Sequence, residues 1–414
     1  MSAPGRVCAR AAAALVLCAL AACGSAGTKP DASPTLTWYV GPDRADTAAL
    51  ARTCTSSAGG AYKIEVKQLP KDVDARHEML VRRFLAEDTS IDLLSLDSEF
   101  TAEFSAARFL APLPEELAPA FGKDIAPAAL AAATYDDQLV AVPWWFDPQL
   151  LWFRGNVAER AGLNTKEPIS WDELVSGAER LGVTIQIDDP DGNGLTQWIN
   201  ALVVGAGGDL VDGTGREAKV GLDSESGRTA ASIVELYLDA KVGPGPSSDA
   251  LKAFSAPEGG FLLAASSVIS DPAVAAVAAD MGWTAYPVVG ITKVAPLSGV
   301  GLAVPLYAPR SDLSFAAISC LTSAGNLSSI MVGAGHSASR LTTYDDPGVK
   351  GAYPMAAVTK PAVMTGAALP ATPYWHVAQA AISDTWLPLD DFAPDRAITQ
   401  SQKAVRAAIS GKLP

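Results

Sequence analysis

The chain has 414 residues, of which 49% are hydrophobic and 18% are charged, and its formal net charge is −14 at pH 7. This length exceeds what one compact core usually serves, so we expect a folded protein of two lobes. The acidic balance argues against nucleic-acid binding and against electrostatic attachment to an anionic membrane. The three histidines are widely spaced and have no cysteine nearby, which argues against a structural zinc site.

Residues 1–22 have the pattern of a signal peptide. Arg6 and Arg10 give a basic start, and the apolar run of about ten residues that follows is too short to span a bilayer. The letters LAAC that end at Cys23 are similar to the bacterial lipobox, in which cleavage precedes a lipid-carrying cysteine. We therefore expect a mature chain anchored by lipid at Cys23, with a tether over 23–34. Ordinary secretion with a chance cysteine is the alternative.

Two cysteines remain after the signal peptide and the anchor, Cys54 and Cys320. Both fall in runs with helical character. In an oxidising compartment two such thiols predict one disulfide, which would join an early helix to a late one. Two buried free cysteines are the alternative.

The first part of the fold alternates predicted strands with predicted helices. The strands are expected over 36–40, 62–68 and 91–96, and the helices over 46–58 and 74–87. This alternation predicts βαβ units and a mostly parallel sheet in an α/β fold. Ligands of such sheets bind beyond the carboxyl ends of the strands, where Asp97 falls. Asp97 is therefore a candidate ligand acceptor, and the alternative is that it caps the next helix.

The stretch 137–154 (DQLVAVPWWFDPQLLWFR) is the most informative in the sequence. Its first apolar run predicts a buried strand that Pro143 ends, because proline has no N–H for a ladder. Large aromatic rings and a carboxylate at a strand break predict a cavity wall suited to a sugar. We expect Trp145, rather than Trp144, to stack on the ligand, and Asp147 to accept from its hydroxyls. The alternatives are rings that fill a core and a salt bridge from Asp147 at a hinge.

The second half adds further candidates for the ligand site. Trp198 begins an apolar run that predicts a buried helix, and Trp283 lies in a predicted strand. Asp271 follows another predicted strand, and Gly299 lies in the strand expected over 298–305. Core packing is the alternative for both tryptophans and for Asp271.

The segment 189–194 (DPDGNG) matches the first half of a calcium-binding loop. The twelfth position of that motif is Asn200, so the bidentate glutamate is missing. We therefore expect a polar loop and no metal or other cofactor.

These pieces, in this order, resemble a known family. The lipobox, LTWYV, IDLLSLD, QLVAVPWWFDPQLLWFR, ISWDEL and SGVGLAVP are similar to the extracellular solute-binding proteins of ABC sugar importers, the maltose-binding-like group. The likeness is strongest to an actinobacterial, trehalose-binding branch of that group. Two positions depart from that branch: a Trp-Pro pair is replaced by Asp271-Pro272, and an arginine by Leu369. These changes make trehalose itself doubtful, although a saccharide remains the expected ligand.

The resemblance implies a two-lobe periplasmic-binding-protein fold whose hinge-linked lobes close on a ligand. We expect 35–141 with 288–340 to form the first lobe, and 142–287 with 341–414 to form the second. The implied partners are a di- or oligosaccharide and the permease subunits of an ABC importer, with no nucleic acid and no second copy of the chain. The expected location is extracytoplasmic, on the outer face of the cytoplasmic membrane.

Two other functions compete with a receptor. Paired acids such as Asp97 and Asp147 would suit a secreted glycoside hydrolase, and a lipoprotein scaffold would bind no ligand. No motif of serine hydrolases, zinc proteases, P-loop NTPases or dinucleotide-binding enzymes occurs in the sequence. The sequence therefore predicts a protein without catalytic activity.

Overall fold

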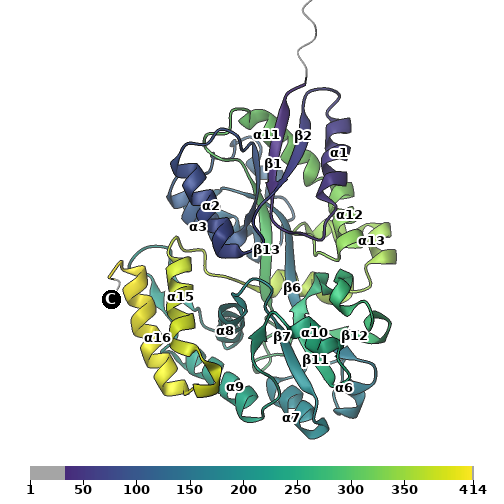
Figure 1. Cartoon of the computed structure of the whole chain (residues 1–414), viewed down its shortest axis with the longest axis vertical. Helices are drawn as coiled ribbons and strands as arrows, with labels where there is room; N and C mark the ends of the chain where they lie inside the picture. The colour runs from purple at the N-terminus through teal and green to yellow at the C-terminus, as the bar shows by residue number, and fades with distance from the viewer. Residues whose placement is uncertain (1–32, 413–414) are drawn as a thin grey trace, which may run out of the picture.

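The computed structural model describes residues 33–412, so the expected signal peptide, the lipidated Cys23 and most of the tether lie outside the described residues. Two lobes lie one above the other, and two long strands run between them (Figure 1). The expected mixed α/β, two-lobe architecture is confirmed.

The first lobe is built on parallel strands. Strand β1 (Thr35–Val40) pairs in parallel with β2 (Lys63–Gln68) and with β3 (Leu93–Asp97). Strand β13 (Pro296–Ala303) then pairs with β3 in the antiparallel sense. The three strands expected from the alternation are therefore present, and the carboxyl end of β3 brings Asp97 to the edge that faces the second lobe.

The second lobe repeats this plan with a different strand order. Strand β7 (Thr184–Asp188) lies between β10 (Pro246–Ser247) and β11 (Gly259–Ala265) and is parallel to both. Strand β11 pairs in the antiparallel sense with β6 (Val142–Arg154), and so does β12 (Met281–Thr284).

Strands β6 and β13 join the lobes into one ten-stranded sheet of order β10-β7-β11-β6-β13-β3-β1-β2, with β12 and β14 (Ala367–Ala368) at its sides. The first half of β6 pairs with β13 and its second half with β11, and the change falls between Pro148 and Gln149. The lobes are therefore connected by hydrogen-bonded strands as well as by loops.

The prediction that Pro143 ends a strand is wrong, because β6 runs through it. On β13, Val300 pairs with Trp145 and the next residue, Gly301, pairs with Pro143, so Trp144 is the extra residue of a β-bulge. A bulge is a position at which a strand tolerates proline, since the ladder is already interrupted there.

Helices cover both faces of the sheet (Figure 1). Ser170 and Glu173 form a capping box at the start of α7 (Trp171–Leu181), in which each side chain accepts a hydrogen bond from the backbone N–H of the other residue. In the first half of the chain the helices are α1 (Thr47–Ser57), α2 (Val73–Leu85), α3 (Thr101–Ala106), α4 (Ala118–Phe121), α5 (Pro127–Ala132), α6 (Val157–Arg160), α7 (Trp171–Leu181) and α8 (Gly194–Gly205). In the second half they are α9 (Glu225–Asp239), α10 (Ala250–Ser255), α11 (Ser311–Leu321), α12 (Ala324–Ala334), α13 (Pro347–Ala352), α14 (Ala356–Thr365), α15 (Trp375–Trp386) and α16 (Pro394–Ile409).

The C-terminal helices pack in two groups. Helix α13 packs on α12, and α14 packs on α5. Helices α15 and α16 pack on α8 and α9 of the second lobe. Residues 347–365, which the expected division grouped with the second lobe, thus pack beside α5 and α12; the division of the chain between the lobes stays a prediction.

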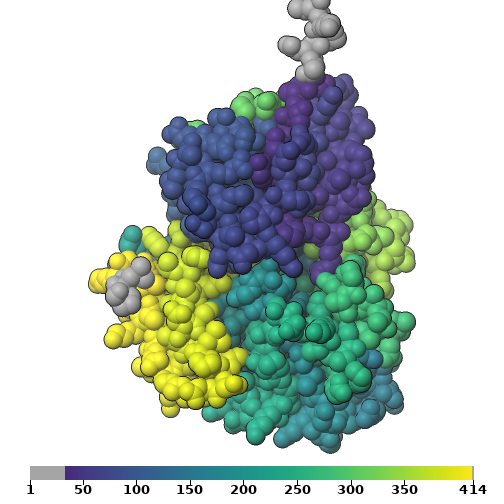
Figure 2. Space-filling model, in the orientation of Figure 1, coloured from purple at the N-terminus to yellow at the C-terminus, as the bar shows by residue number. Residues whose placement is uncertain are grey.

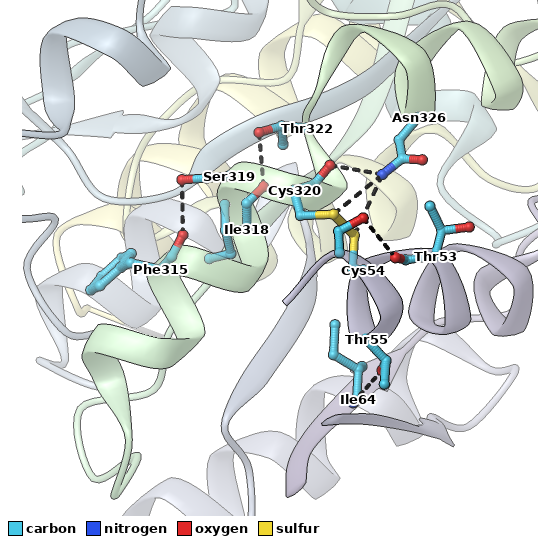
Figure 3. Close-up of a disulfide and its surroundings, with 11 residues drawn as sticks. Thr53, Cys54, Thr55, Ile64, Phe315, Ile318, Ser319, Cys320, Thr322 and Asn326 are labelled. Carbon is cyan, nitrogen blue, oxygen red and sulfur yellow. Dashed lines mark hydrogen bonds between the residues drawn. A yellow bond between two sulfur atoms is a disulfide. The ribbon is translucent and has the colours of Figure 1, made fainter. Parts of the chain in front are cut away.

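The predicted disulfide is confirmed: Cys54 of α1 is bonded to Cys320 of α11, with their Cα atoms 5.8 Å apart. Asn326 lies beside it, and its side-chain amide donates to the Cys320 carbonyl at 2.8 Å and lies 3.4 Å from the Cys54 sulfur. Figure 3 shows the amide directed at both sulfurs. The bond therefore joins two helices of the first lobe and leaves the interlobe connection free.

Within residues 33–412, no single helix is long and apolar enough to cross a membrane; α11 and α12 together pass that test by length and composition, with a bend of 59° between them. Both helices contribute buried side chains to the core of the first lobe.

Candidate ligand-binding cleft

A cavity of about 400 Å³ lies between the lobes, at the carboxyl ends of strands from both. Figure 2 shows the first lobe, purple to blue, set closely against the teal and green second lobe. The first lobe lines the cavity with the β1–α1 loop and the end of β3, and the second lobe with the end of β7 and the segment after β11. The charged side chains that line it are Asp43, Arg44, Lys71, Arg76, Asp97, Asp147, Asp188, Asp191, Asp271 and His336.

Trp145 supplies the aromatic surface of the cavity. It is partly exposed and lines the cavity, whereas Trp144 is fully buried and packs edge-on against Trp38 with ring centroids 5.6 Å apart. The indole N–H of Trp145 donates to Asp43 Oδ2 at 3.1 Å. The bulge at Trp144 thus separates the two neighbouring rings, one into the core and one into the cleft.

Asp147 lies at the floor of the cavity and is 2% exposed. Its Oδ2 is 2.6 Å from Nδ1 of His336, and its Oδ1 accepts the backbone N–H of Ser337 at 2.7 Å. Nε2 of His336 lies 2.8 Å from Asp43 Oδ1. Burial disfavours the imidazolium, but the two carboxylates outweigh it and raise the pKa of His336 to about 10. Burial would raise the pKa of Asp43, but its hydrogen bond and charge interaction with His336 hold it below its ordinary value.

Asp97 lies where the sequence places it, at the end of β3 and on the cavity wall. Its Oδ2 accepts from Nε of Arg76 at 2.7 Å. Burial raises the pKa of Asp97 above its ordinary value, against the opposing charge of Arg76. The Asp97 side chain makes no capping hydrogen bond to the short helix that follows β3. The geometry therefore does not support the alternative in which Asp97 caps that helix.

Asp271 takes part in a contact that crosses the cleft. Its carboxylate forms an ion pair with Arg44 of the opposite lobe, and Arg44 also donates to Ser267 at 3.1 Å. Burial would raise the pKa of Asp271, but Arg44 and the backbone N–H of Ala273 hold it below its ordinary value. Asp271 therefore borders the cavity as part of an interlobe ion pair.

Two further pairs meet across the cleft. The side-chain amide of Asn193 on the second lobe lies 3.3 Å from a carboxylate oxygen of Glu99 on the first. At the outer edge His77 of α2 stacks on His376 of α15, with centroids 4.9 Å apart and an interplanar angle of 11°. The lobes are in direct contact, so this is a closed arrangement.

Several acids near the cleft carry raised pKa values. Burial and nearby acids raise the pKa of Asp188 to about 7, although Arg44 opposes the shift. Burial, then the charge of Asp97, raises the pKa of Glu99 to about 8. In the part of the chain that the structure describes, neither carboxylate has a cation within ion-pair distance. Of the two, Asp188 lines the cavity and is available to hydrogen-bond donors that enter it, whereas Glu99 faces the amide of Asn193.

Three predicted site residues do not line the cavity. Trp198 is 1% exposed and packs in the second-lobe core against Trp171 and Tyr237, with centroids 5.6 and 5.3 Å away. Trp283 on β12 packs against Trp152 at 6.0 Å. For both tryptophans the geometry shows core packing, which was the alternative to a role in ligand binding.

Gly299 is the third of these residues. Its neighbours Ser298 and Val300 line the cavity, and Gly299 itself faces the ring of Phe146, where a Cβ would lie 2.3 Å from the nearest ring carbon. The glycine is needed for strand packing rather than for ligand contact, because a strand alternates its faces.

The loop that resembles half a calcium site caps a helix. Asp189 Oδ1 accepts the backbone N–H of Gly194 at 2.9 Å, at the start of α8. Among residues 33–412 no group of three His, Cys, Asp or Glu side chains is placed to hold a metal ion.

Seven of the ten charged side chains that line the cleft were not predicted from the sequence as ligand-site residues. Asp43 and Arg44 lie in the loop after the carboxyl end of β1, and Asp97 lies at the carboxyl end of β3, so the rule that placed Asp97 could have found all three. Asp188 ends β7 and could have been found by the same rule. His336 follows α12 in an irregular segment and carries no sequence pattern that marks it.

Comparison with known proteins agrees with this geometry. A family model described as "Bacterial extracellular solute-binding protein" matches residues 61–327. A probable ABC transporter-binding protein of Deinococcus radiodurans is 25% identical over 167 residues, which cover 37% of this chain and 38% of that protein. The chain thus aligns with well under half the length of this curated relative.

Solved structures share the whole fold. Maltose-bound MalE3 of T. maritima is 23% identical and has a TM-score of 0.75, over 90% of this chain and 99% of that one. The GacH receptor of Streptomyces glaucescens, solved unliganded and with acarbose, is 22% identical with a TM-score of 0.78, over 91% and 98% of the two chains. A cyclic alpha-maltosyl-1,6-maltose binding protein from Arthrobacter globiformis is 17% identical with a TM-score of 0.75, over 92% and 100%. Since the family model matches well over half of the chain, the protein belongs to the bacterial extracellular solute-binding proteins.

Proposed function

We propose that the protein is the receptor of an ABC importer and captures a saccharide in the cleft between its lobes. One observation carries the proposal: an interlobe cavity of about 400 Å³ combines the indole of Trp145 with carboxylates from both lobes. The volume lies in the usual range of small-molecule sites, about 300–1,000 Å³. Closure of the two lobes on the sugar would present it to the permease subunits.

The chemistry of the lining suits a polyol with flat apolar faces. A sugar ring can stack its C–H face on the indole of Trp145, while its hydroxyls donate to Asp97 and Asp188. Each hydrogen bond to a charged group contributes about 1.5–3 kcal/mol. A few such bonds and the stacked ring, less the cost of closing the lobes, give an affinity in the micromolar range, about −8 kcal/mol.

The charge of the lining restricts the class of sugar. Six aspartates line the cavity and face Arg44, Lys71, Arg76 and the His336 ring. Uronates and sugar phosphates would add like charge to this surface, so we propose a neutral di- or oligosaccharide. The resemblance to the trehalose-binding branch keeps trehalose among the candidates, although Asp271 and Leu369 replace residues of that branch. Maltose and related glucosides are the others, since MalE3 was solved with maltose and the Arthrobacter globiformis relative is a cyclic alpha-maltosyl-1,6-maltose binding protein.

A receptor fits the carboxylates better than a hydrolase does. In a glycosidase one carboxyl group protonates the leaving oxygen and a second acts as a nucleophile or base. Both oxygens of Asp147 already accept from His336 and Ser337, and Asp97 is paired with Arg76. We therefore propose that the chain does no chemistry on its ligand and that ATP hydrolysis by other subunits drives transport. Incubation with each bound sugar, followed by chromatography, should return it unchanged.

Membership of an extracellular solute-binding family implies an extracytoplasmic location. We propose further that Cys23 carries a lipid that holds the monomeric receptor on the outer face of the cytoplasmic membrane. Mass spectrometry of the N-terminal peptide should show a diacylglyceryl cysteine, and Cys23→Ala should release the protein into the medium. An unmodified N-terminus would contradict the anchor.

A thermal-shift screen over neutral, amine-bearing and acidic mono- and disaccharides tests the proposed function. A ligand present at 100 times its Kd stabilises the folded state by about 2.7 kcal/mol, which shifts Tm by several degrees. If no sugar shifts Tm, the scaffold without a ligand becomes the better interpretation.

Calorimetry on a sugar found in that screen then tests the site. Asp97→Ala and Asp188→Ala should each raise Kd about tenfold or more, as expected for loss of one charged hydrogen bond. Asp384→Ala, an exposed aspartate on α15, is the matched control and should leave Kd unchanged. Cleft variants that bind as the parent does would show that the site lies elsewhere.

A further inference from the structure

His336 lines the cleft beside Trp145 and is 4% exposed. Its Nδ1 is 2.6 Å from Asp147 Oδ2 and its Nε2 is 2.8 Å from Asp43 Oδ1. An ionised carboxylate oxygen can only accept, so both ring nitrogens must carry a proton for both bonds to form. The ring is therefore an imidazolium held between two acids, in agreement with its raised pKa.

The flat face of this imidazolium covers the cleft tryptophan. The rings of His336 and Trp145 stack with centroids 4.1 Å apart and an interplanar angle of 17°. A cation over an indole face is attracted by the ring quadrupole, and more strongly where water is excluded. The indole N–H is held separately, by Asp43 Oδ2 at 3.1 Å.

Asp43 links the two rings, because one of its oxygens accepts from the imidazolium and the other from the indole. The four side chains come from three separate parts of the chain: the β1–α1 loop, strand β6 and the segment after α12. The orientation of Trp145 is thus fixed at one face and at one edge by groups that are themselves anchored, and the indole still lines the cavity.

We propose that His336 is a positioning residue for ligand binding: its ring holds the indole of Trp145 in the orientation on which the saccharide stacks. The inference rests on the proposed function and adds to it a residue that acts through Trp145. A different role, in which His336 contributes to binding through charge alone, would not depend on the tryptophan.

A double-mutant cycle separates these roles. The parent, His336→Gln, Trp145→Ala and the double variant are titrated by calorimetry with maltose, trehalose, cellobiose and melibiose. For a sugar that the parent binds, His336→Gln should raise Kd about tenfold, the equivalent of losing a well-placed aromatic contact. In the Trp145→Ala background the same substitution should change Kd by less than about twofold, because the two residues act as one unit. Asp384→Ala, an exposed side chain on α15 that does not line the cavity, is the control and should leave Kd unchanged.

A measurement without ligand supports the cycle. An imidazolium in contact with an indole quenches the fluorescence of the indole. The emission of Trp145 is obtained by subtracting the spectrum of the protein with Trp145→Phe from that of the protein with Trp145. This difference should be larger in the His336→Gln background than in the parent. If His336→Gln does not fold, Asp43→Asn takes its place, because it keeps the shape of Asp43 and removes the charge that both rings share.

The outcomes are distinct. A parent that binds none of the sugars refutes the proposed function. If the parent binds a sugar, two results refute this inference and leave the proposed function standing. Either His336→Gln does not change Kd, or it raises Kd by the same factor with Trp145 present and with Trp145→Ala. The inference is supported if His336→Gln lowers the affinity only in the protein that keeps Trp145, and if the fluorescence change is also seen.

Discussion

Replacement of His336 by glutamine should remove a pH dependence of stability that the parent protein carries. The unfolded histidine has an ordinary pKa of 6.5, and the folded one has a pKa of about 10. Between these values the folded state holds a proton that the unfolded state has released, so the free energy of unfolding falls as pH rises, by about 1.4 kcal/mol per unit. The stabilisation is fully present below pH 6.5 and is lost as pH passes 10.

The magnitude follows from the size of the shift. From 6.5 to about 10 is 3.5 units, which at 1.36 kcal/mol per unit amounts to about 5 kcal/mol. Over the accessible interval from pH 7 to pH 9 the parent should lose about 2–3 kcal/mol more than the His336→Gln variant. The charged groups that face the ring are Asp43 and Asp147, and burial of Asp147 excludes screening by water.

Urea unfolding at half-unit steps from pH 6.5 to pH 9 measures this difference directly. Because both proteins share every other titrating group, the gap between their curves isolates the histidine. His376→Gln, whose ring has no carboxylate within ion-pair distance among the described residues, is the matched control for replacing a histidine by glutamine. Parallel curves for the parent and His336→Gln would refute the assignment of His336 as a buried imidazolium.

Three further changes test other parts of the fold. Replacing Cys54 and Cys320 by serine opens a loop of 266 residues. This change should lower the free energy of unfolding, measured by chemical denaturation, by about 5 kcal/mol. If reductant destabilises the serine variant as much as the parent, the disulfide is not the cause of the loss. Gly299→Ala places a Cβ 2.3 Å from a ring carbon of Phe146 and should lower the free energy of unfolding by about 1–3 kcal/mol. In the control Gly325→Ala the new Cβ meets nothing within 4 Å, so this variant should not be destabilised. Equal melting temperatures for the two variants would contradict the packing role of Gly299. Arg44→Ala removes the ion pair with Asp271 across the cleft and should change the free energy of unfolding by less than about 1 kcal/mol. Without ligand, small-angle scattering should show a larger radius of gyration for this variant than for the parent. An unchanged radius would show that this pair does not hold the lobes closed.

The sequence was most informative where one local rule decides the structure. Alternating strands and helices predicted the sheet of the first lobe, and the position after β3 placed Asp97 on the cleft. Two cysteines in helical runs predicted the disulfide that joins α1 to α11. Each of these depends on a short stretch and a general rule of chain geometry.

It was least informative where distant segments decide. Trp198 and Trp145 both fall in apolar runs of the sequence, and only the packing of α8 against α9 shows that Trp198 is core. Pro143 was expected to end a strand because the bulge that accommodates it depends on β13, more than 150 residues away in the chain. His336 is brought between Asp43 and Asp147 by the tertiary fold alone.

The shared sheet determines where a movement between the lobes can be observed. Strands β6 and β13 pair along the crossing and then continue into both lobes, so any rotation must pivot close to that ladder. Displacement in a rigid rotation grows with distance from the axis, and the stacked rings of His77 and His376 lie on opposite lobes at the outer edge. A donor and an acceptor dye attached at positions 77 and 376 would therefore form an optical gauge, separating when the molecule opens and approaching when it takes up its cargo, so that the receptor could serve as a reagentless sensor.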